Sequence, residues 1–422
     1  MKHFTILITE AIKQSVIDSA AKLAREHPEL GTPELVLVSA HPHDYEQFTQ
    51  AGVRIIACDY TDASIKELLA SIKEPIKAVV CRGDKYVQYL RRLALFLPPN
   101  VPVSSPEALE AATNKRRMRA AFHAQYPEIT PQFVQVDAAS QDSVETKLGH
   151  LQFPVIIKPA SLASSLLIQK CNTMAELKEH LTETFAVLDQ TYRLEGRSEP
   201  PEVIVEEFLT GDFYSIDSYV MAAGKIWHCP LVSYVPAEQL GIDDFFLYKR
   251  STPVSLPQSE VAAAELTAAK AIQAAQLCYS SVHVELIKTA NGWKVIEIGP
   301  RIGRFRNIMY NEAYGIDHGY NDLLIHLGLK PVLPKVSAPK GCVAYSIYPH
   351  QEGILKEVTG LSGIEKLQST VYFRNDSHVG RRVLQAKHGG HALCEVILAA
   401  DSPAQLNRDA DWFEHHVEAI VA

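Results

Sequence analysis

The sequence predicts a mixed fold, with a parallel α/β domain at the N-terminus followed by lobes of α+β character. Short β-branched runs alternate with helical stretches over the first hundred residues, which is typical of parallel strands with crossover helices. Later strand runs adjoin one another around tight turns, as they do in antiparallel sheets. A chain of 422 residues has room for roughly three domains.

The composition excludes several classes of protein. Lys and Arg number 41 against 49 Asp and Glu, so the net charge of -8 offers no overall positive field to a nucleic-acid backbone. The seven cysteines show no C-x-x-C spacing, and we interpret them as reduced thiols. The first apolar run ends at Thr9, too early for a signal peptide, and no apolar stretch approaches the roughly 20 residues of a membrane span. We therefore expect a cytoplasmic protein that binds neither nucleic acid nor membranes.

The N-terminal parallel domain is predicted to span residues 1–103. Its strand runs are FTILIT at 4–9, ELVLVS at 34–39, RIIACD at 54–59 and AVVCRG at 78–83. The first run is followed by TEAIKQS, which has no glycine. A dinucleotide-binding Rossmann domain needs glycines in this turn, so we reject an NAD-binding function.

Two further lobes are predicted, a central one at 104–210 and a C-terminal one at 211–422. The central lobe begins with a helical segment at 104–127, for which Ser105 is the expected N-cap. Its strand runs lie at 153–159, 166–171 and 202–209. The C-terminal lobe contains a strand at 214–221, an alanine-rich helix at 257–278, a β-rich block to about 398 and a last helix at 402–420.

The most informative segment is SVHVELIKTANGWKVIEIGP at 281–300, which the pattern predicts to be a β-hairpin. A three-residue loop that ends at Gly292 would place Glu285 directly opposite Glu297. A two-residue loop would put the two glutamates on opposite faces, so we prefer the longer loop. The preferred register gathers four apolar residues on the other face, namely Val284, Leu286, Ile296 and Ile298.

Two carboxylates that face each other in a strand pair destabilise it unless a cation lies between them. Mg²⁺ binds carboxylate and phosphate oxygens, so a metal-bound nucleotide suits the pair. The alternative is a solvated acidic face that Lys288 or Lys294 neutralises, and the hairpin alone does not decide between the two. Three arginines follow within a few residues, at 301, 304 and 306. Guanidinium groups bind phosphate and carboxylate well, and their presence favours the metal site.

With these residues the chain resembles the ATP-grasp superfamily of carboxylate-amine ligases over most of its length. Four segments carry the resemblance, in the order NKRRMRAAF, FPVIIKPASLASSLLIQK, VIVEEFLTGDFYSIDSYV and VHVELIKTANGWKVIEIGPRIG. The resemblance implies an ATP-grasp fold that binds ATP between the central and C-terminal lobes, with Mg²⁺ or Mn²⁺ as the metal.

The resemblance also implies roles for individual residues. Lys115 and Lys158 match the two lysines that contact ATP phosphates, and Ser165 matches the serine of the loop between two strands. Taken alone, Lys115 would indicate a solvated helix face, whereas Lys158 at the end of a buried strand needs a partner. The adenine-binding hinge corresponds to Glu206, Glu207, Phe208 and Leu209.

The remaining matches concern the metal and the reacting groups. Glu285 and Glu297 correspond to the metal ligands, and Arg301 to the arginine near the transferred phosphoryl group. Arg304 and Arg306 occupy the stretch that lines the substrate pocket, and we expect one of them to pair with a substrate carboxylate.

The sequence departs from the family pattern in three places. Leu162, Ser164 and Leu167 stand at positions where the loop has glycines. Phe213 replaces a glutamate that binds ribose in other members. Gly299 replaces an asparagine that often completes the metal shell, so water would fill its place or one metal ion would be held less tightly.

The resemblance implies an ATP-dependent ligase that joins a carboxylate to an amine through an acyl phosphate and releases ADP and phosphate. Its domain order most resembles L-amino acid ligases that make dipeptides, so we expect amino-acid substrates. Two alternatives stay open, a biotin carboxylase-like enzyme and a catalytically silent nucleotide-binding module. A homodimer formed through the N-terminal domain is an expectation from the family.

Overall fold

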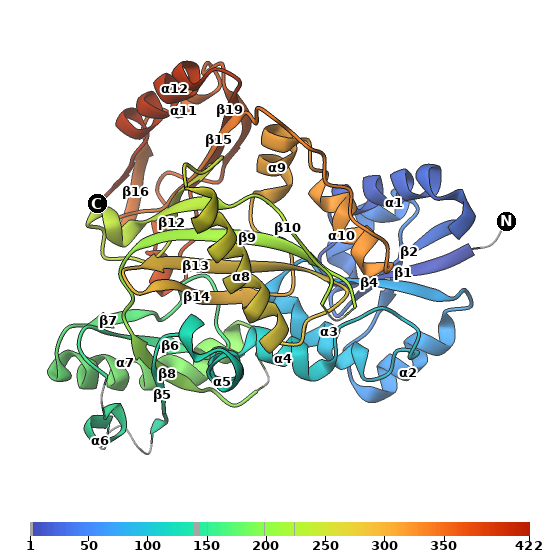
Figure 1. Ribbon diagram of the computed structural model, residues 1–422, viewed down its shortest axis with the longest axis horizontal. Coiled ribbons are helices and arrows are strands. Elements are labelled where there is room, and N and C mark those ends of the chain that lie inside the picture. The colour runs from blue at the N-terminus through green and yellow to red at the C-terminus, as the bar shows by residue number, and fades with distance from the viewer. Residues whose placement is uncertain (1–2, 139–143, 150, 198, 223) are drawn as a thin grey trace.

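The computed structural model describes residues 3–138, 144–149, 151–197, 199–222 and 224–422. Figure 1 shows the N-terminal domain in blue at one side of a long curved sheet, with the green central lobe below that sheet and the red C-terminal block above it. The predicted fold class is confirmed, because the N-terminal sheet is parallel and the other sheets are antiparallel.

The N-terminal domain contains a four-stranded parallel sheet in the order β3-β2-β1-β4. Its elements are β1 (His3–Thr9), α1 (Gln14–Glu26), β2 (Thr32–Ser39), β3 (Arg54–Ala57), α2 (Asp62–Ser71), β4 (Ile76–Val80) and α3 (Val87–Ala94). Successive side chains of β1 face opposite sides of the sheet. Ile6 and Ile8 join the core under α1, whereas Leu7 joins the core under α2 and α3.

The helical segment predicted at 104–127 is two helices, α4 (Pro106–Thr113) and α5 (Lys115–Gln125). Ser105 caps α4 as predicted. Asn114 separates the helices because its side chain accepts a backbone N–H from the first turn of α5. The break directs Lys115, the first residue of α5, to the central lobe, where its backbone N–H donates to the Ala160 carbonyl at 2.7 Å.

The central lobe has a four-stranded antiparallel sheet in the order β5-β8-β6-β7. Its elements are β5 (Phe133–Val136), α6 (Val144–Leu148), β6 (Val155–Pro159), β7 (Gln169–Cys171), α7 (Met174–Leu194) and β8 (Val203–Glu207). The strand predicted at 166–171 begins only at Gln169, because turns occupy 164–167. This leaves a loop free to reach toward the C-terminal lobe.

The long sheet of the C-terminal lobe has the order β14-β13-β9-β11-β12-β15-β19-β17, and β10 pairs with β9. Its strands are β9 (Asp212–Val220), β10 (Ile226–His228), β11 (Val232–Pro236), β12 (Leu247–Thr252), β13 (Ser280–Thr289), β14 (Gly292–Gly299), β15 (Gly341–Ile347), β17 (Thr370–Asn375) and β19 (Cys394–Ala400). The helices α8 (Gln258–Ala274), α9 (Arg306–Tyr314) and α10 (His318–His326) lie in the first part of this lobe.

The helices of this lobe cover different parts of the molecule. The alanine face of α8 packs on β13 and β14, where Ala264 and Ala268 contact the same core as Val284. The α10 helix instead joins the α1 face of the N-terminal sheet through Tyr320 and Leu323. The N-terminal domain is therefore fixed against the C-terminal lobe, as Figure 1 shows for α1 and α10.

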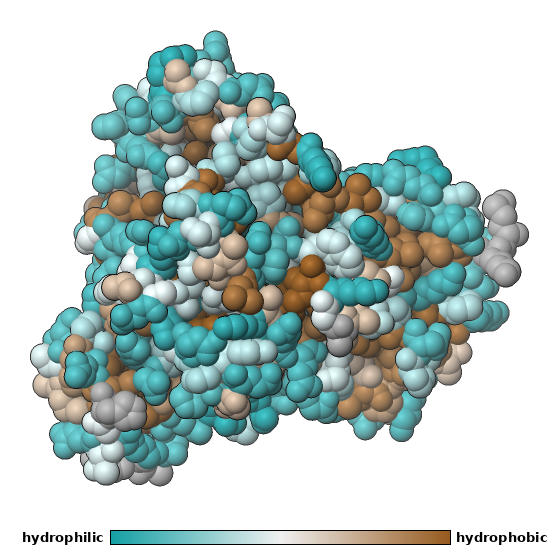
Figure 2. Space-filling view, viewed as in Figure 1, coloured by the Kyte–Doolittle hydropathy of each residue, from teal (hydrophilic) through white to brown (hydrophobic). Residues whose placement is uncertain are grey.

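The C-terminal block adds a small sheet in the order β18-β16-β20. Its elements are β16 (Gly353–Val358), α11 (Leu361–Ile364), β18 (Arg382–Val383), α12 (Pro403–His416) and β20 (Ala419–Val421). The last helix, α12, ends at His416, whereas the sequence predicted that it would extend to residue 420. The face seen in Figure 2 is mostly hydrophilic, with hydrophobic residues in separate patches. None of the described helices is long and apolar enough to cross a membrane.

Candidate active site

A large cavity lies between the sheet of the central lobe and the β13-β14 hairpin. Its walls include Lys158 of β6 and Glu206 of β8 on one side, and Glu285 of β13 and Glu297 of β14 on the other. The other predicted site residues that line it are Lys115, Ser165, Glu207, Phe208, Leu209, Arg301 and Arg304. One predicted site residue, Arg306, does not line it.

The two glutamates of the hairpin face each other, as predicted. Glu285 is the direct partner of Glu297 in the β13-β14 ladder, and both side chains keep some exposure, 27% and 40%. The predicted three-residue loop is wrong, because Thr289 pairs with Gly292 across a two-residue turn. Gly292 has φ of 97°, in the left-handed region that favours glycine.

A β-bulge reconciles the short turn with the facing glutamates. The register shifts by one residue between Glu285 and Leu286, so that Leu286 pairs with Val295 and Ile296 is the extra residue. Ile296 was expected in the apolar face but lines the cavity instead, and Val295 takes its place in the core. The bulge thus brings Glu297 to the cavity side.

Arg119 of α5 stabilises this bulge. Its guanidinium donates to the carbonyls of Val295 and Ile296, both at 2.7 Å. It also donates from Nε to Glu206 Oε1 at 2.7 Å, and the side chain is fully buried. One cation therefore fixes strand β8 to the β13-β14 hairpin. Arg119 was not among the residues predicted from the sequence, although it lies one helical turn after Lys115 and so on the same face of α5.

Lys158 and Glu206 form a buried ion pair in the cavity wall. Lys158 Nζ lies 2.7 Å from Glu206 Oε2. Burial favours the neutral acid, but Arg119 and Lys158 outweigh it and lower the pKa of Glu206 to about 2. The Lys158 pKa is also lowered, because burial outweighs the attraction of Glu206. The Glu206 carboxylate is thus committed to two cations.

The hinge after β8 has part of its backbone already bonded. The N–H of Glu207 donates to the Gln132 carbonyl at 3.0 Å, and the N–H of Phe208 donates to the Pro154 carbonyl at 3.2 Å. Among the hydrogen bonds of the described residues, none comes from the Leu209 N–H. Glu207, Phe208 and Leu209 are the residues whose backbone is expected at the adenine. Of their N–H groups, that of Leu209 therefore remains available to donate to a ligand.

Lys115 lies between the lobes at the edge of the cavity. Its ammonium donates to the Leu162 carbonyl at 2.6 Å and is 3.4 Å from Glu297 Oε1. The side chain is buried, so the solvated helix face that its basic neighbours suggested is wrong. Lys115 instead adds positive charge beside the two glutamates.

The loop between β6 and β7, where the family has glycines, adopts the left-handed backbone conformation that glycine favours. Ser164 and Leu167 have φ of 58° and 57°, and Ser165 between them has φ of 63°. Such values are strained for residues with a side chain. Leu162, the third expected glycine position, is outside this region. The loop is held to the C-terminal lobe, because Ser165 Oγ donates to the Phe245 carbonyl at 3.1 Å.

Arg301 points into the cavity and is held by a residue of the N-terminal domain. Its Nε is 2.8 Å from Asp84 Oδ1, and its Nη2 is 2.6 Å from Asp84 Oδ2. The Arg301 guanidinium holds the pKa of Asp84 below its usual value, although burial opposes this shift. Asp84 was not predicted from the sequence, yet it follows β4 at the carboxyl edge of the parallel sheet, where such sheets commonly bind ligands.

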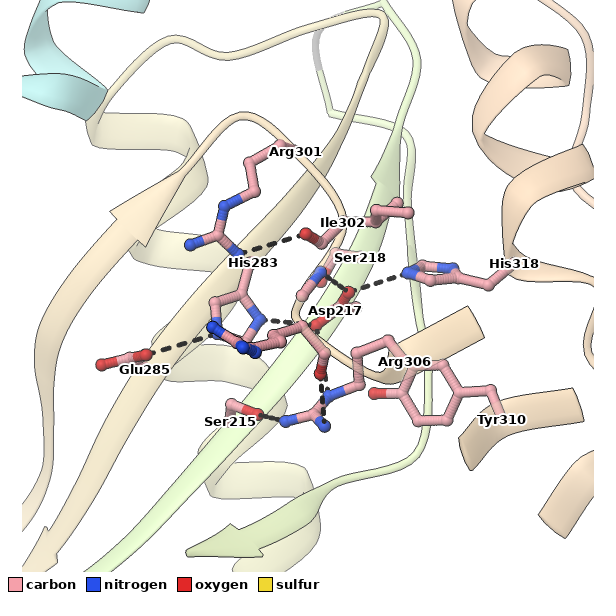
Figure 3. Close-up of polar contacts among 12 residues, drawn as sticks. Ser215, Asp217, Ser218, His283, Glu285, Arg301, Ile302, Arg306, Tyr310 and His318 are labelled. Carbon is pink, nitrogen blue, oxygen red and sulfur yellow. Dashed lines mark hydrogen bonds and ion pairs between the residues drawn. The ribbon is translucent and has the colours of Figure 1, made fainter. Parts of the chain in front are cut away.

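The two arginines expected at the substrate differ in position. Arg304 is half exposed, lines the cavity and pairs with the carboxylate of Glu395. Arg306 is fully buried, and its Nη2 donates to Ser215 Oγ and to the Tyr234 hydroxyl, both at 2.7 Å. Figure 3 shows Arg306 beside Ser215, below the glutamate end of the site. The expectation that Arg306 lines the substrate pocket is therefore wrong, because residue 306 begins α9 and points into the core.

A further arginine, Arg250 of β12, lies in the cavity wall where none was predicted from the sequence. It is buried, and its Nη1 donates to the Leu247 carbonyl and to Ser346 Oγ, both at 3.1 Å. Burial lowers the pKa of Arg250 to about 10. Among the described residues it has no carboxylate partner within ion-pair distance. Such a cation suits an anionic ligand.

Glu285 is connected to a buried histidine network (Figure 3). His283 Nε2 lies 3.4 Å from Glu285 Oε1, and His283 Nδ1 lies 2.7 Å from Asp217. His318 Nε2 is 2.8 Å from the other oxygen of Asp217. Burial favours a neutral Asp217, but the two histidines hold its pKa well below the usual value. His283 is therefore a buried histidine in which both ring nitrogens have a partner.

The donor set at the hairpin fits a hard divalent cation that is shared with a phosphate. Two carboxylates face one cavity, and two lysines lie around it. Among the described residues, no group of three or more His, Cys, Asp or Glu side chains could hold an ion by itself. A Mg²⁺ ion here would take the rest of its oxygen ligands from phosphate and water, which is the usual way that proteins bind this ion with nucleotides.

Comparisons with known proteins bear on the fold. An ATP-grasp domain model matches residues 151–308. A search of curated proteins found no match. Among solved structures, an L-amino acid ligase from Bacillus licheniformis superposes with a TM-score of 0.77 at 16% identity, and the match covers 100% of this chain and 99% of that one.

Two other solved structures share the fold. An N5-carboxyaminoimidazole ribonucleotide synthetase from Thermus thermophilus gives a TM-score of 0.67 at 17% identity, with 99% of both chains covered. A biotin carboxylase from Campylobacter jejuni gives 0.63 at 14% identity, with 99% of this chain and 92% of that one covered. At these identities the likeness concerns the fold. The chain therefore contains an ATP-grasp domain and has the fold of the ATP-grasp superfamily.

Proposed function

We propose that the protein is an ATP-dependent ligase that joins the carboxylate of an amino acid to an amine and releases ADP and phosphate. The observation that carries this proposal is the pair Glu285 and Glu297, which faces one cavity together with Lys115 and Lys158. This arrangement offers acidic ligands for a metal ion and cations for phosphates within a single site.

ATP would lie in the cavity between the central lobe and the hairpin. The Leu209 N–H would donate to adenine, and Lys158 and Lys115 would contact the phosphates. Glu285 and Glu297 would hold Mg²⁺ or Mn²⁺, which when bound would offset the negative charge of the phosphates. Phe213 lines the same cavity, so an apolar side chain would lie where other members have a ribose-binding glutamate.

The reaction would proceed in two steps. A carboxylate oxygen of the amino acid attacks the γ-phosphorus of ATP, the bond to the β-phosphate oxygen breaks, and ADP leaves. The amine then attacks the acyl carbon of the acyl phosphate, loses a proton, and expels inorganic phosphate as the amide forms. Arg301 would stabilise the charge that develops on the transferred phosphoryl group, and positioning of the reactants would supply much of the rate.

The acid substrate would bind at the arginine end of the cavity. Arg250 has no carboxylate partner among the described residues, and Arg304 shares Glu395 with Arg374. A substrate carboxylate placed here would satisfy Arg250 without breaking an existing ion pair. We therefore propose Arg250 and Arg304 as the substrate-binding arginines, with Arg306 supporting them from the core through Tyr234.

The preference for amide formation over carboxylation is supported by the fold comparison. The amino acid ligase superposes with a TM-score of 0.77, against 0.63 for the biotin carboxylase. The catalytically silent alternative is disfavoured by Arg301, which lines the cavity and is held in place by Asp84.

A phosphate-release screen tests the proposal. The protein is incubated with Mg²⁺ and ATP together with single amino acids, pairs of amino acids, simple amines or bicarbonate, and the products are identified by mass. We expect release that requires an acid and an amine, together with an amide product. Release that depends on bicarbonate, or nucleotide binding without turnover under every condition, would contradict it.

A further inference from the structure

The N-terminal domain contributes one carboxylate to the candidate active site. Asp84 belongs to the turn after β4, and both of its oxygens lie within 2.9 Å of Arg301 Nε. The cavity lining includes Asp84 together with Arg301 and Gly299. Among the described residues of the N-terminal domain, Asp84 is the one that lines the cavity.

Gly299 makes room for Asp84. A Cβ atom added at Gly299 would lie 3.0 Å from Asp84 Oδ1 and 3.7 Å from Arg301 Nε. Gly299 ends β14 two residues after Glu297, so a side chain there would point to the same side as that glutamate. Any longer side chain at 299 would therefore compete with the Asp84 carboxylate for one space.

We propose that Asp84 is a positioning residue for Arg301, and that Gly299 lacks a side chain in order to admit Asp84. The two positions thus form a matched pair, in which the N-terminal domain fills the space beside the second glutamate. This inference rests on the proposed function in one respect, namely the assignment of Arg301 to the transferred phosphoryl group.

The geometry of the pair explains how Asp84 would act. Asp84 binds Nε and Nη2, which form one edge of the Arg301 guanidinium, and Nη1 donates to the Ile302 carbonyl at 3.1 Å. A guanidinium has further N–H donors, and these remain for a ligand in the cavity. Figure 3 shows the bond to Ile302 at the far end of the side chain. Arg301 is therefore held at a fixed orientation before any substrate arrives, which lowers the cost of ordering it during the reaction.

The ion pair also joins two parts of the chain that are far apart in sequence. Asp84 and Arg301 are separated by 217 positions, and a second buried pair, Arg82 with Asp322, lies on the same turn of the N-terminal domain. Arg82 Nε is 3.0 Å from Asp322 Oδ2, and both side chains are buried. The turn at 82–84 is therefore anchored independently of Arg301, so that removal of the Asp84 carboxylate should leave the domain in place.

A series of variants tests the steric part by thermal unfolding. The series comprises D84A, D84N, G299A and G299N, and the doubles D84A/G299A and D84A/G299N, with D62A and G319A as controls. Asp62 is an exposed partner of Arg92, and a Cβ at Gly319 would meet only ordinary contacts, so both controls should behave as wild type. We expect G299N to lower Tm in the wild type and to leave Tm unchanged in the D84A background. An equal loss of Tm in both backgrounds would overturn the matched pair.

Steady-state kinetics test the positioning part. We expect D84A to lower kcat by about a hundredfold with little change in the KM for ATP, because a misplaced group acts mainly on the transition state. D84N keeps the shape of the side chain but not its charge, and should show most of the same loss. Wild-type kcat in D84N would mean that residue 84 only fills space, and would overturn the proposal.

The thermal-unfolding and kinetic experiments also distinguish a failure of this inference from a failure of the proposed function. If the wild-type protein binds Mg²⁺ and ATP but forms no product with any acid and amine, the proposed function fails. The Tm series is still decisive in that case, because it measures the contact between residues 84 and 299 without any turnover.

Discussion

The Arg119 guanidinium donates to both carboxylate oxygens of Glu206, at 2.7 and 3.2 Å, in the wall between the two lobes. The same guanidinium binds two carbonyls of the β14 bulge. Glu206 in turn holds Lys158. A single buried cation therefore links the strand before the hinge, the lysine expected at the phosphates, and the hairpin that carries the acidic pair. This arrangement makes the geometry of the candidate site depend on a residue that need not touch any ligand.

Replacement of Arg119 should strongly destabilise the protein. R119A leaves the buried Glu206 carboxylate short of one partner and removes a donor from the carbonyls of Val295 and Ile296, so we expect a loss of about 3 to 5 kcal/mol in the free energy of unfolding. Urea denaturation followed by circular dichroism measures this loss. The matched control is R117A, in the same helix, whose exposed pair with Glu110 should contribute about 0 to 1 kcal/mol. A loss as small as that of R117A would mean that Arg119 does not hold the site together.

The acidic pair should control the metal dependence of nucleotide binding. E285Q and E297Q each remove one negative charge from the candidate metal site, so both should weaken the binding of Mn²⁺ with ADP by at least about tenfold. Electron paramagnetic resonance of free Mn²⁺ measures binding without turnover. Glu357, on the exposed face of β16, provides the control E357Q. Metal binding that is the same in all three variants would place the metal elsewhere.

The arginines should separate substrate binding from folding. R250M and R304A should raise the KM for the acid substrate far more than the KM for ATP, because we assign both side chains to that substrate. R306K should instead lower Tm, because Arg306 is fully buried and donates to Ser215 and Tyr234. Initial rates at varied acid and varied ATP, together with thermal unfolding, distinguish the two effects. A KM for the acid that is unchanged in R250M would remove Arg250 from the substrate site.

The ion pairs of Glu206 should make the free energy of unfolding depend on pH in the acid range. The folded pKa of Glu206 is about 2, below its ordinary value of 4.5. Because the pKa is depressed on folding, the contribution is fully present above pH 4.5 and is lost as pH falls toward 2. The difference in unfolding free energy between wild type and E206Q should therefore shrink over this range. Denaturation at a series of pH values measures it, and a difference that grew on acidification would contradict the assigned shift.

The facing glutamates were predicted from the sequence for a reason that is partly wrong. Alternation of apolar and acidic residues placed Glu285 opposite Glu297, but the turn is shorter than expected and a bulge at Ile296 makes up the difference. A bulge adds one residue to one strand and leaves no clear mark in a single sequence, because its position depends on what holds the freed carbonyls. Here Arg119 holds them, from a different helix.

The site residues that were not predicted from the sequence act over long sequence separations. Asp84 meets Arg301 only after the parallel sheet docks on the C-terminal lobe, and nothing local to AVVCRGD indicates that contact. An arginine in a strand is usually exposed, so the sequence around Arg250 does not indicate that this side chain is buried in the cavity wall. Arg306 was misplaced for a related reason, since a run of three arginines does not reveal which one the next helix turns into the core. The local patterns and the family resemblance therefore indicated the fold and eleven of the residues that line the cavity, whereas tertiary packing determined which charges are paired.

The location of the metal and the nucleotide decides whether this cavity is the active site. A crystal structure of the protein grown with MnCl₂ and ADP measures it, because the anomalous signal of manganese locates the metal. We predict manganese bound to both Glu285 and Glu297, with the ADP phosphates near Lys115 and Lys158 and the adenine at Leu209. Manganese or nucleotide bound away from this cavity, with the two glutamates free of both, would contradict the proposed ATP-dependent ligase.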